Sequence, residues 1–385
     1  MEQKTPSWKN TIRKKFFLES SFYLWMVFML GLSSCTAPEK SNKPQNKTIQ
    51  KTQVPNTKNV WLENKTSIKG KALGTTFVIK TGEDSLKAAP MEIEELFEGF
   101  NAELSTYIDA SLISQFNASN SSIDLNSTLY FQSCFELSQE VYDYTEGAFD
   151  PTVYPLVSLW GFFKDIEKAP TAVEIDSVLN FVGFDNNDHY SYNDGVLTKL
   201  DPRFKLVFNA IAKGQAVDVL ADYLDGKGHQ SYFIEVGGEI RVKGMNDRGT
   251  KWVIGVDEPV EVNTGNEGLS KRDLENYIEV SDRAVATSGN YRDFYVLDGK
   301  KYSHTLSPVT GRPVRHHILS ATVIADDAAT ADAYATAFMV MGVEKSLDLI
   351  KKHPELNLEA YLLFDGGSGR IERAYSKGMT HYLMK

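Results

Sequence analysis

A change of composition near residue 59 limits which part of this chain can fold. Lys, Asn, Gln, Thr and Pro dominate residues 36–59, and almost no side chain there could be buried, so we expect a solvated tether over residues 35–59. The chain as a whole is 42% hydrophobic and 11% aromatic, which is ample for a packed core. The sequence therefore predicts one folded domain over residues 60–385.

The N-terminus has the pattern of a secretion signal. Basic residues precede an apolar run at 22–32, which is too short for a membrane span of about 20 residues. Two serines and Cys35 follow, and residues 32–35 resemble a bacterial lipobox, in which the cysteine is acylated. We therefore expect a signal peptide over 1–34 and a lipid anchor at Cys35, facing the periplasm from a bacterial membrane. An ordinary signal peptide with an incidental cysteine is the alternative.

Charge and cysteine content narrow the function classes further. The net charge of -10 argues against nucleic-acid binding, because no broad basic face can neutralise phosphates. If Cys35 carries a lipid, Cys134 has no partner for a disulfide, since the chain has two cysteines. We interpret Cys134 as a small buried apolar side chain.

The stretch at 327–336 is the sharpest functional signal. Residues i and i+4 share one face of a helix, so Asp332 and Thr336 place a carboxylate beside a hydroxyl on an Ala-rich surface. Mg²⁺ takes oxygen ligands and needs only one or two protein carboxylates. The alternative is an Asp that favours the helix dipole and a Thr that bonds to its own turn.

A second stretch, at 209–218, is predicted to join a strand to a helix. We expect paired strands at 196–200 and 204–208, and a helix from Lys213 to about Gly226. Free N–H groups at a helix N-terminus attract phosphate, and a carbonyl in the same turn could reach a metal.

Residues 147–161 combine two prolines, apolar side chains and one carboxylate, Asp150. We predict a shaped wall without regular structure, which would suit a planar heteroaromatic ligand. A packed connection whose Asp caps a turn is the alternative. The sequence also predicts a strand at 71–80, helices at 93–104 and 127–144, a loop at 111–117, and a surface insertion at 257–277.

The C-terminal third is predicted to form mainly strands. A hairpin is predicted at 294–306 across Asp298-Gly299, with His304 in its second strand, and further strands at 284–292, 320–325, 358–364 and 371–375. A lone strand histidine is more often structural than catalytic. The sequence contains no Ser/His/Asp order, Cys/His zinc spacing or glycine-rich phosphate loop.

Taken together, the motifs resemble the ApbE family of FAD:protein FMN transferases from about residue 71 to 342. The motifs are, in chain order, Leu-Gly-Thr-Thr-Phe (73–77), Leu-Ser-Thr-Tyr (104–107), Gly-Ala-Phe-Asp-Pro-Thr-Val (147–153), Leu-Trp-Gly (159–161), Ile-Ala-Lys-Gly-Gln-Ala-Val-Asp (211–218), Val-Gly-Gly-Glu-Ile (236–240), Thr-Ser-Gly-Asn-Tyr-Arg (287–292), Tyr-Ser-His (302–304), Pro-Val-Thr-Gly-Arg-Pro-Val (308–314) and Ala-Asp-Ala-Tyr-Ala-Thr-Ala (331–337).

The resemblance implies an α+β fold, ApbE-like (T-fold-like), with a mixed or antiparallel sheet and packed helices in one catalytic domain. It also implies Mg²⁺-dependent transfer of FMN from FAD to a Thr or Ser hydroxyl of secreted or membrane-bound flavoproteins, with release of AMP. By motif, His304 would assist the acceptor hydroxyl, and Asp332, Thr336 and the Ala210 carbonyl would bind the metal. The residues lining the FAD pocket would be Leu73, Tyr107, Ala148, Phe149, Asp150, Lys213 and Leu306.

Two positions depart from the family pattern. Ser307 stands where the family commonly has Asp, and Val207 stands where many members have an acidic residue. Asp326 or Asp327 could compensate in part. FAD pyrophosphatase activity, with release of FMN and AMP, and a flavin-binding lipoprotein without catalysis are the alternative functions. The acceptor, the choice of inner or outer membrane, the preferred divalent ion and the oligomeric state, including a homodimer, stay open.

Overall fold

The computed structural model describes residues 59–384, except for residues 120, 163–165, 167, 186–187, 258–273, 291–293, 298–299, 304, 315–316 and 368–369. The predicted signal peptide, the tether, Cys35 and His304 therefore lie outside the described residues, and these expectations stay predictions. Within the described ranges, every helix is too short or too polar to span a bilayer.

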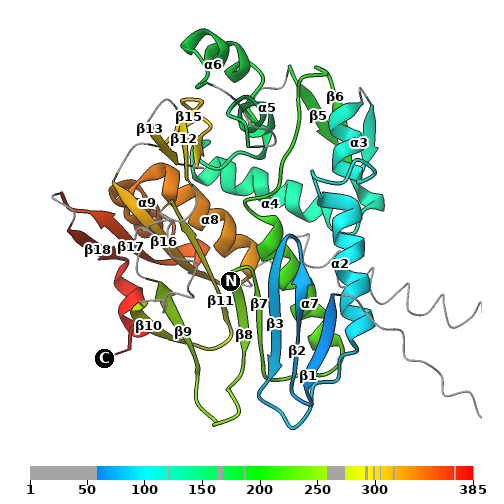
Figure 1. Cartoon of the computed structure of the whole chain (residues 1–385), viewed down its shortest axis with the longest axis vertical. Coiled ribbons are helices and arrows are strands. Elements are labelled where there is room, and N and C mark those ends of the chain that lie inside the picture. Colours follow the sequence, from blue (N-terminus) through cyan, green and yellow to red (C-terminus); the bar gives the residue numbers. More distant parts are fainter. Residues whose placement is uncertain are drawn as a thin grey trace, which may run out of the picture. The chain divides into compact units, whose positions relative to one another are not determined.

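An antiparallel sheet forms the centre of the fold (Figure 1). Among the described residues it has nine strands, and every neighbouring pair is antiparallel. In spatial order they are β1 (Val60–Asn64), β2 (Ser67–Ala72), β3 (Thr75–Thr81), β7 (Tyr232–Val236), β8 (Glu239–Lys243), β11 (Arg283–Gly289), β16 (Ile318–Ala325), β17 (Glu359–Asp365) and β18 (Ile371–Tyr375). The predicted α+β class is confirmed, and the sheet is antiparallel.

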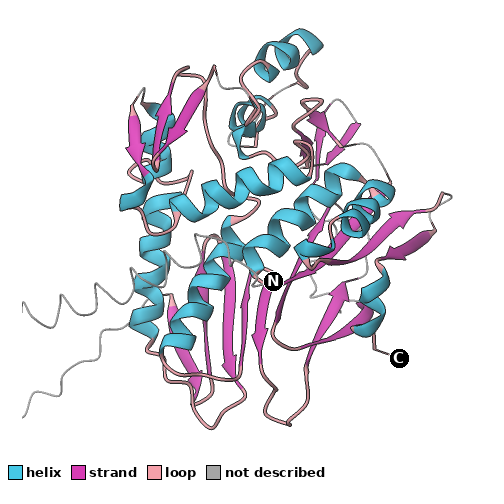
Figure 2. Ribbon diagram, turned by 180° about the vertical axis from the view of Figure 1, so that it is seen from behind, coloured by secondary structure: helices cyan, strands magenta, loops and turns pink. Residues whose placement is uncertain are grey.

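Helices cover one face of this sheet, as the view from behind shows (Figure 2). Helix α2 (Pro90–Leu104) packs near β1, α7 (Ala212–Gly226) lies on β7 and β8, and α8 (Ala328–Met341) lies on β11 and β16. The other helices are α3 (Leu112–Ala118), α4 (Phe131–Tyr144), α5 (Tyr154–Leu159), α6 (Ala172–Leu179) and α9 (Val343–Lys352), with 3₁₀ turns η1 (Leu125–Ser127), η2 (Pro151–Val153), η3 (Pro354–Leu356) and η4 (Lys377–His381).

Helix α8 is buried on nearly all sides. Its alanines, including Ala331, Ala333 and Ala335, are fully buried, because small side chains let α7, β11 and β16 approach closely. Asp327 caps its first turn by accepting the Thr330 N–H at 2.9 Å, and Gly342 ends it with a φ of 81°.

The opposite face of the sheet carries a second core. Arg241 of β8 pairs with Asp218 of α7, so its neighbours Ile240 and Val242 point to the other side. There they pack with β9 (Trp252–Asp257) and β10 (Leu274–Val280), an antiparallel pair. Smaller antiparallel sheets complete the fold: β4 (Ser122–Asp124), β6 (Val196–Lys199) and β5 (Tyr190–Asn193); β12 (Phe294–Leu297) and β13 (Lys300–Ser303); β14 (Leu306–Ser307) and β15 (Arg312–Pro313).

Most predicted elements are present. Residues 274–277, at the end of the predicted surface insertion, instead belong to strand β10, and residues 258–273 lie outside the described residues. Two other predicted elements are also wrong. The expected loop at 111–117 is helix α3, which Ser111 caps by accepting the Ser114 N–H. The expected strand at 204–208 is irregular, although its sequence is apolar. The Asn117 side chain takes the place of a strand partner there, since it donates to the Leu206 carbonyl and accepts the Leu206 N–H, both at 2.8 Å. Strand β6 therefore pairs with β4 and β5 instead.

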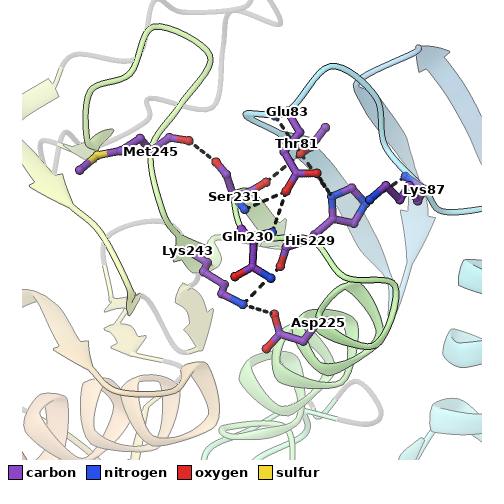
Figure 3. Close-up of polar contacts among 9 residues, drawn as sticks. All are labelled: Thr81, Glu83, Lys87, Asp225, His229, Gln230, Ser231, Lys243 and Met245. Atoms are coloured by element: carbon purple, nitrogen blue, oxygen red, sulfur yellow. Dashed lines mark hydrogen bonds and ion pairs between the residues drawn. The ribbon is translucent and has the colours of Figure 1, made fainter.

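A fully buried histidine joins the β3–α2 connection to the α7–β7 connection (Figure 3). The Nε2 atom of His229 accepts the Lys87 N–H at 2.9 Å, so the ring proton is on Nδ1. This Nδ1 donates to Glu83 Oε2 at 3.0 Å, and Glu83 Oε1 accepts the Gln230 N–H at 2.6 Å. These bonds tie the connection after β3 to the connection after α7, and the N-terminal ends of both elements line the site described next.

Candidate functional site

A cavity of about 840 Å³ lies among β3, β8, β11, α7, α8 and the segment after α4. Its volume is within the ordinary range of small-molecule sites. Most of the predicted site residues line it: Tyr107, Ala148, Phe149, Asp150, Ala210, Lys213, Leu306, Asp332 and Thr336. Leu73 instead lines an adjoining cavity of about 590 Å³, and both cavities share Thr75 and Thr76. His304 lies outside the described residues, but its neighbour Thr305 lines the main cavity.

Strand pairing explains why the cavity opens here. β11 pairs with β8 only from Arg283 to Val285, and it pairs with β16 along its whole length to Gly289. The end of β11 therefore has no β8 partner in the described ladder, and Thr287, Ser288 and Gly289 face the cavity. β11 therefore extends past Glu239, the first residue of β8, at the point where the candidate ligands lie.

The two sequence stretches that carry the predicted site meet at the α7–α8 contact. A Cβ on Gly214 would lie 2.2 Å from the Ala328 carbonyl oxygen, so only glycine allows this approach. The Gly214 N–H donates to Asp332 Oδ2 at 3.1 Å. Asp218, one turn along α7, accepts the N–H groups of Ala328 and Ala329 at 3.0 and 2.9 Å. Both carboxylates therefore bridge the two helices.

Asp332 and Thr336 offer hard oxygen donors at the cavity. Asp332 is 3% exposed, and burial raises the pKa of its carboxyl although Lys213 acts to lower it. The Thr336 hydroxyl lies 3.2 Å from the Ser288 hydroxyl. In the described part of the chain, no three His, Cys, Asp or Glu side chains are grouped as a metal site. A cation here would therefore need Asp332 together with neutral oxygens, and a carboxylate, a hydroxyl and the Ala210 carbonyl fit the preference of Mg²⁺.

Sequence reasoning missed Glu239 as a site residue. It lies at the start of β8, is 2% exposed, lines the cavity and forms an ion pair with Lys213. Burial and the nearby Asp332 act to raise the pKa of the Glu239 carboxyl, and the Lys213 ammonium acts to lower it. One feature of the sequence could have identified Glu239: it directly follows Gly237-Gly238 in a strand of the buried type. An unpaired carboxylate there would cost free energy, so a partner was to be expected.

The wall at 147–161 is more regular than predicted, because it contains η2 and α5. Asp150 is 6% exposed and accepts the Thr152 N–H at 2.8 Å, so it caps η2 and also lines the cavity. Burial raises the pKa of Asp150 to about 7. The Trp160 indole N–H donates to the Gly311 carbonyl at 2.8 Å and ties the wall to the turn after β14. Tyr107 is 73% exposed at the rim.

The structure also places the residues that depart from the expected pattern. Val207 lines the cavity, whereas Ser307 closes its own turn by accepting the Thr310 N–H at 3.2 Å. Asp327 caps α8, and Asp326 accepts a bond from Asn357 at 2.8 Å, so the expected compensation by these two is wrong. Among the described residues, the carboxylates that line the cavity besides Asp332 are Asp150, Glu235 and Glu239. Cys134 is fully buried in α4, as predicted.

Comparison with known proteins agrees with this arrangement. The model of the ApbE family matches residues 73–362. An FAD:protein FMN transferase of Vibrio cholerae serotype O1 is 37% identical over 286 residues, which cover 73% of this chain and 82% of that relative. One of Haemophilus influenzae is 34% identical over 321 residues, covering 80% and 89%.

Solved structures show the same fold. The flavin transferase ApbE from Vibrio cholerae superposes with a TM-score of 0.71 at 32% identity, covering 82% of this chain and 98% of that one. The apo form of the Pseudomonas stutzeri flavinyl transferase ApbE superposes with a TM-score of 0.70 at 30% identity, covering 82% and 95%. This chain therefore belongs to the ApbE family.

Proposed function

We propose that this protein is an enzyme that transfers FMN from FAD to a Thr or Ser hydroxyl of a protein acceptor. One observation carries the proposal: a single cavity of about 840 Å³ holds oxygen donors on α8, the Lys213 ammonium and the wall at 148–150. Relatives that match over most of the chain are FAD:protein FMN transferases. An elongated dinucleotide needs such a site, with apolar surface for the ring system and charge for the pyrophosphate.

The reaction exchanges a phosphoanhydride bond for a phosphoester bond. The acceptor oxygen attacks the phosphorus atom on the FMN side of the pyrophosphate, and the bond from this phosphorus to the bridging oxygen breaks. AMP leaves with that oxygen, FMN stays linked through its phosphate, and the hydroxyl proton passes to a base. From its motif, His304 is our candidate for this base, because a neutral imidazole can accept a proton near pH 7.

The residues around the pyrophosphate would act by position and charge. Asp332, Thr336 and the Ala210 carbonyl would hold a divalent cation, which, when bound, neutralises charge on the phosphate oxygens. Lys213 would supply a second positive charge to the same oxygens. Ala148, Phe149 and Asp150 would orient the flavin, and Tyr107 would cover it from the rim of the cavity.

Incubation of the protein with FAD, Mg²⁺ and a Thr-containing acceptor tests this proposal. We expect a flavin-labelled acceptor and AMP in equal amounts, and no label when the acceptor Thr is replaced by Ala. Asp332→Ala should abolish the reaction, because the cation loses its only carboxylate ligand. Free FMN with AMP would indicate a pyrophosphatase instead, and intact bound FAD would indicate a carrier without catalysis.

We also propose that the mature protein is a lipid-anchored protein that acts on flavoproteins outside the cytoplasm. The support is the order of basic residues, apolar run and Cys35 at the N-terminus, followed by a polar tether. Expression of the full chain and of Cys35→Ser, followed by membrane fractionation and mass spectrometry of the N-terminal peptide, tests it. An unmodified Cys35 in the membrane fraction would contradict the anchor.

A further inference from the structure

Two buried carboxylates from different elements attract the Lys213 ammonium. Its stem passes the β7–β8 turn, where a Cβ on Gly237 would come within 3.2 Å of Lys213 Cδ. Its Nζ pairs with Glu239 Oε1, and Asp332 is the other strong negative charge acting on it. Burial would lower the pKa of Lys213, but Asp332 and Glu239 outweigh this and raise it.

Burial of the Glu239 carboxylate costs free energy, which a residue with a purely structural role would not require. The side chain is 3% exposed, and among the described residues its Oε2 atom has no hydrogen-bond partner. A buried ion pair is often no more stabilising than an apolar pair of similar size. A charge at this position, which lines the cavity, therefore indicates a role in the site.

The geometry points to Glu239 as a positioning residue that keeps the Lys213 ammonium off Asp332, so that the Asp332 carboxylate is available to a divalent cation. This inference rests on the cation site of the proposed function. An ammonium that pairs with Asp332 would neutralise the charge that attracts the cation and would occupy the same oxygens. Glu239 removes this competitor by offering Lys213 a buried partner of its own.

The test measures Mn²⁺ binding to the ligand-free protein by calorimetry, without any turnover. Glu239→Gln keeps the shape of the side chain and removes its charge, so Lys213 should pair with Asp332 and Mn²⁺ affinity should fall. Partners that orient metal ligands typically contribute on the order of 10- to 100-fold in affinity, and we expect a loss of this size.

Two further variants distinguish the effect of losing the Glu239–Lys213 ion pair from the effect of losing one negative charge in the cavity. In a Lys213→Met background, Glu239→Gln should change Mn²⁺ affinity less than about twofold, because no competing ammonium is present. Glu235→Gln removes the same charge from the same cavity, but Glu235 accepts the Gly238 N–H and acts on Lys213 less than Asp332 and Glu239 do, so this variant should stay closer to wild-type affinity. An equal loss in both backgrounds, or an equal loss in Glu235→Gln, would overturn the inference.

The outcomes also separate this inference from the proposed function. If the wild type fails to bind Mn²⁺, or if Asp332→Ala binds it equally well, both the cation site and the inference are wrong. If Asp332→Ala loses binding and Glu239→Gln does not, only the inference is wrong. Should Glu239→Gln not fold, the double variant Lys213→Met with Glu239→Met takes its place. It must then bind Mn²⁺ as tightly as Lys213→Met alone, and weaker binding counts against the inference.

Discussion

Replacement of Gly214 by Ala should force apart the two helices that carry the candidate site. The new Cβ would lie 2.2 Å from the Ala328 carbonyl oxygen and 2.5 Å from its carbon, against ordinary contacts of 3.4 Å or more. Both are backbone atoms of α8, so no rotamer change can relieve the clash. α7 and α8 must separate, and overpacking of this kind costs about 1–3 kcal/mol.

Helix propensity acts in the opposite direction, because Ala is favoured over Gly by about 1 kcal/mol in a helix interior. The net expectation is a loss of up to about 2 kcal/mol in the free energy of unfolding, measured by urea denaturation. The same shift lengthens the bond from the Gly214 N–H to Asp332, so Mn²⁺ affinity should fall as well.

Gly226 provides a matched control on the same helix. A Cβ there would have no neighbour within 4 Å, so Gly226→Ala should be neutral or stabilise the protein by up to about 1 kcal/mol. If Gly214→Ala has the stability and the Mn²⁺ affinity of this control, then α7 and α8 are not in the close contact on which the site depends.

Two carboxyl groups give pH-dependent predictions. Burial would raise the pKa of Glu83, but bonds from Gln230, Ser231 and His229 outweigh it and lower that pKa below 4.5. The wild type should therefore be more stable than Glu83→Gln at neutral pH, and it should lose this advantage as the pH falls below about 4.5. A difference in urea midpoints that stays constant from pH 7 to pH 3 would contradict this. Asp150 behaves oppositely, because its pKa rises from 3.8 to about 7 on folding. The Asp150→Asn variant keeps an oxygen that can accept the Thr152 N–H. The stability of this variant relative to the wild type should increase from pH 4 to about pH 7 and then stay constant. No change over that range would show that Asp150 is ionised in the folded protein.

The sequence predicts most helices and the shared face of Asp332 and Thr336 on α8, because periodic and four-residue spacings are local signals. Asp332 and Thr336 could be placed on one helix face from their spacing alone. Glu239 could not be assigned this way, since its importance comes from a partner 26 positions earlier and from a third group on α8. The strand predicted at 204–208 failed for a similar reason: the Asn117 amide, distant in sequence, occupies the backbone bonds that a neighbouring strand would have used.

Only the three-dimensional structure shows which carboxylates lie near the candidate ligands. Asp326 and Asp327 are close in sequence to the candidate ligands, yet one binds Asn357 and the other caps α8. Glu235 and Glu239 are far away in sequence but line the cavity. Adjacency along the chain is therefore a poor guide to which carboxylates a bound cation would meet.

The burial of α8 has a consequence for how this site can diversify. A helix enclosed on nearly every side by alanine contacts cannot tilt or accept larger residues without disturbing two strands and another helix. The oxygen donors on it are thus fixed in advance of any ligand. Adaptation to new acceptor proteins must instead come from exposed positions at the rim, such as Tyr107, where a substitution leaves the enclosed helix unchanged.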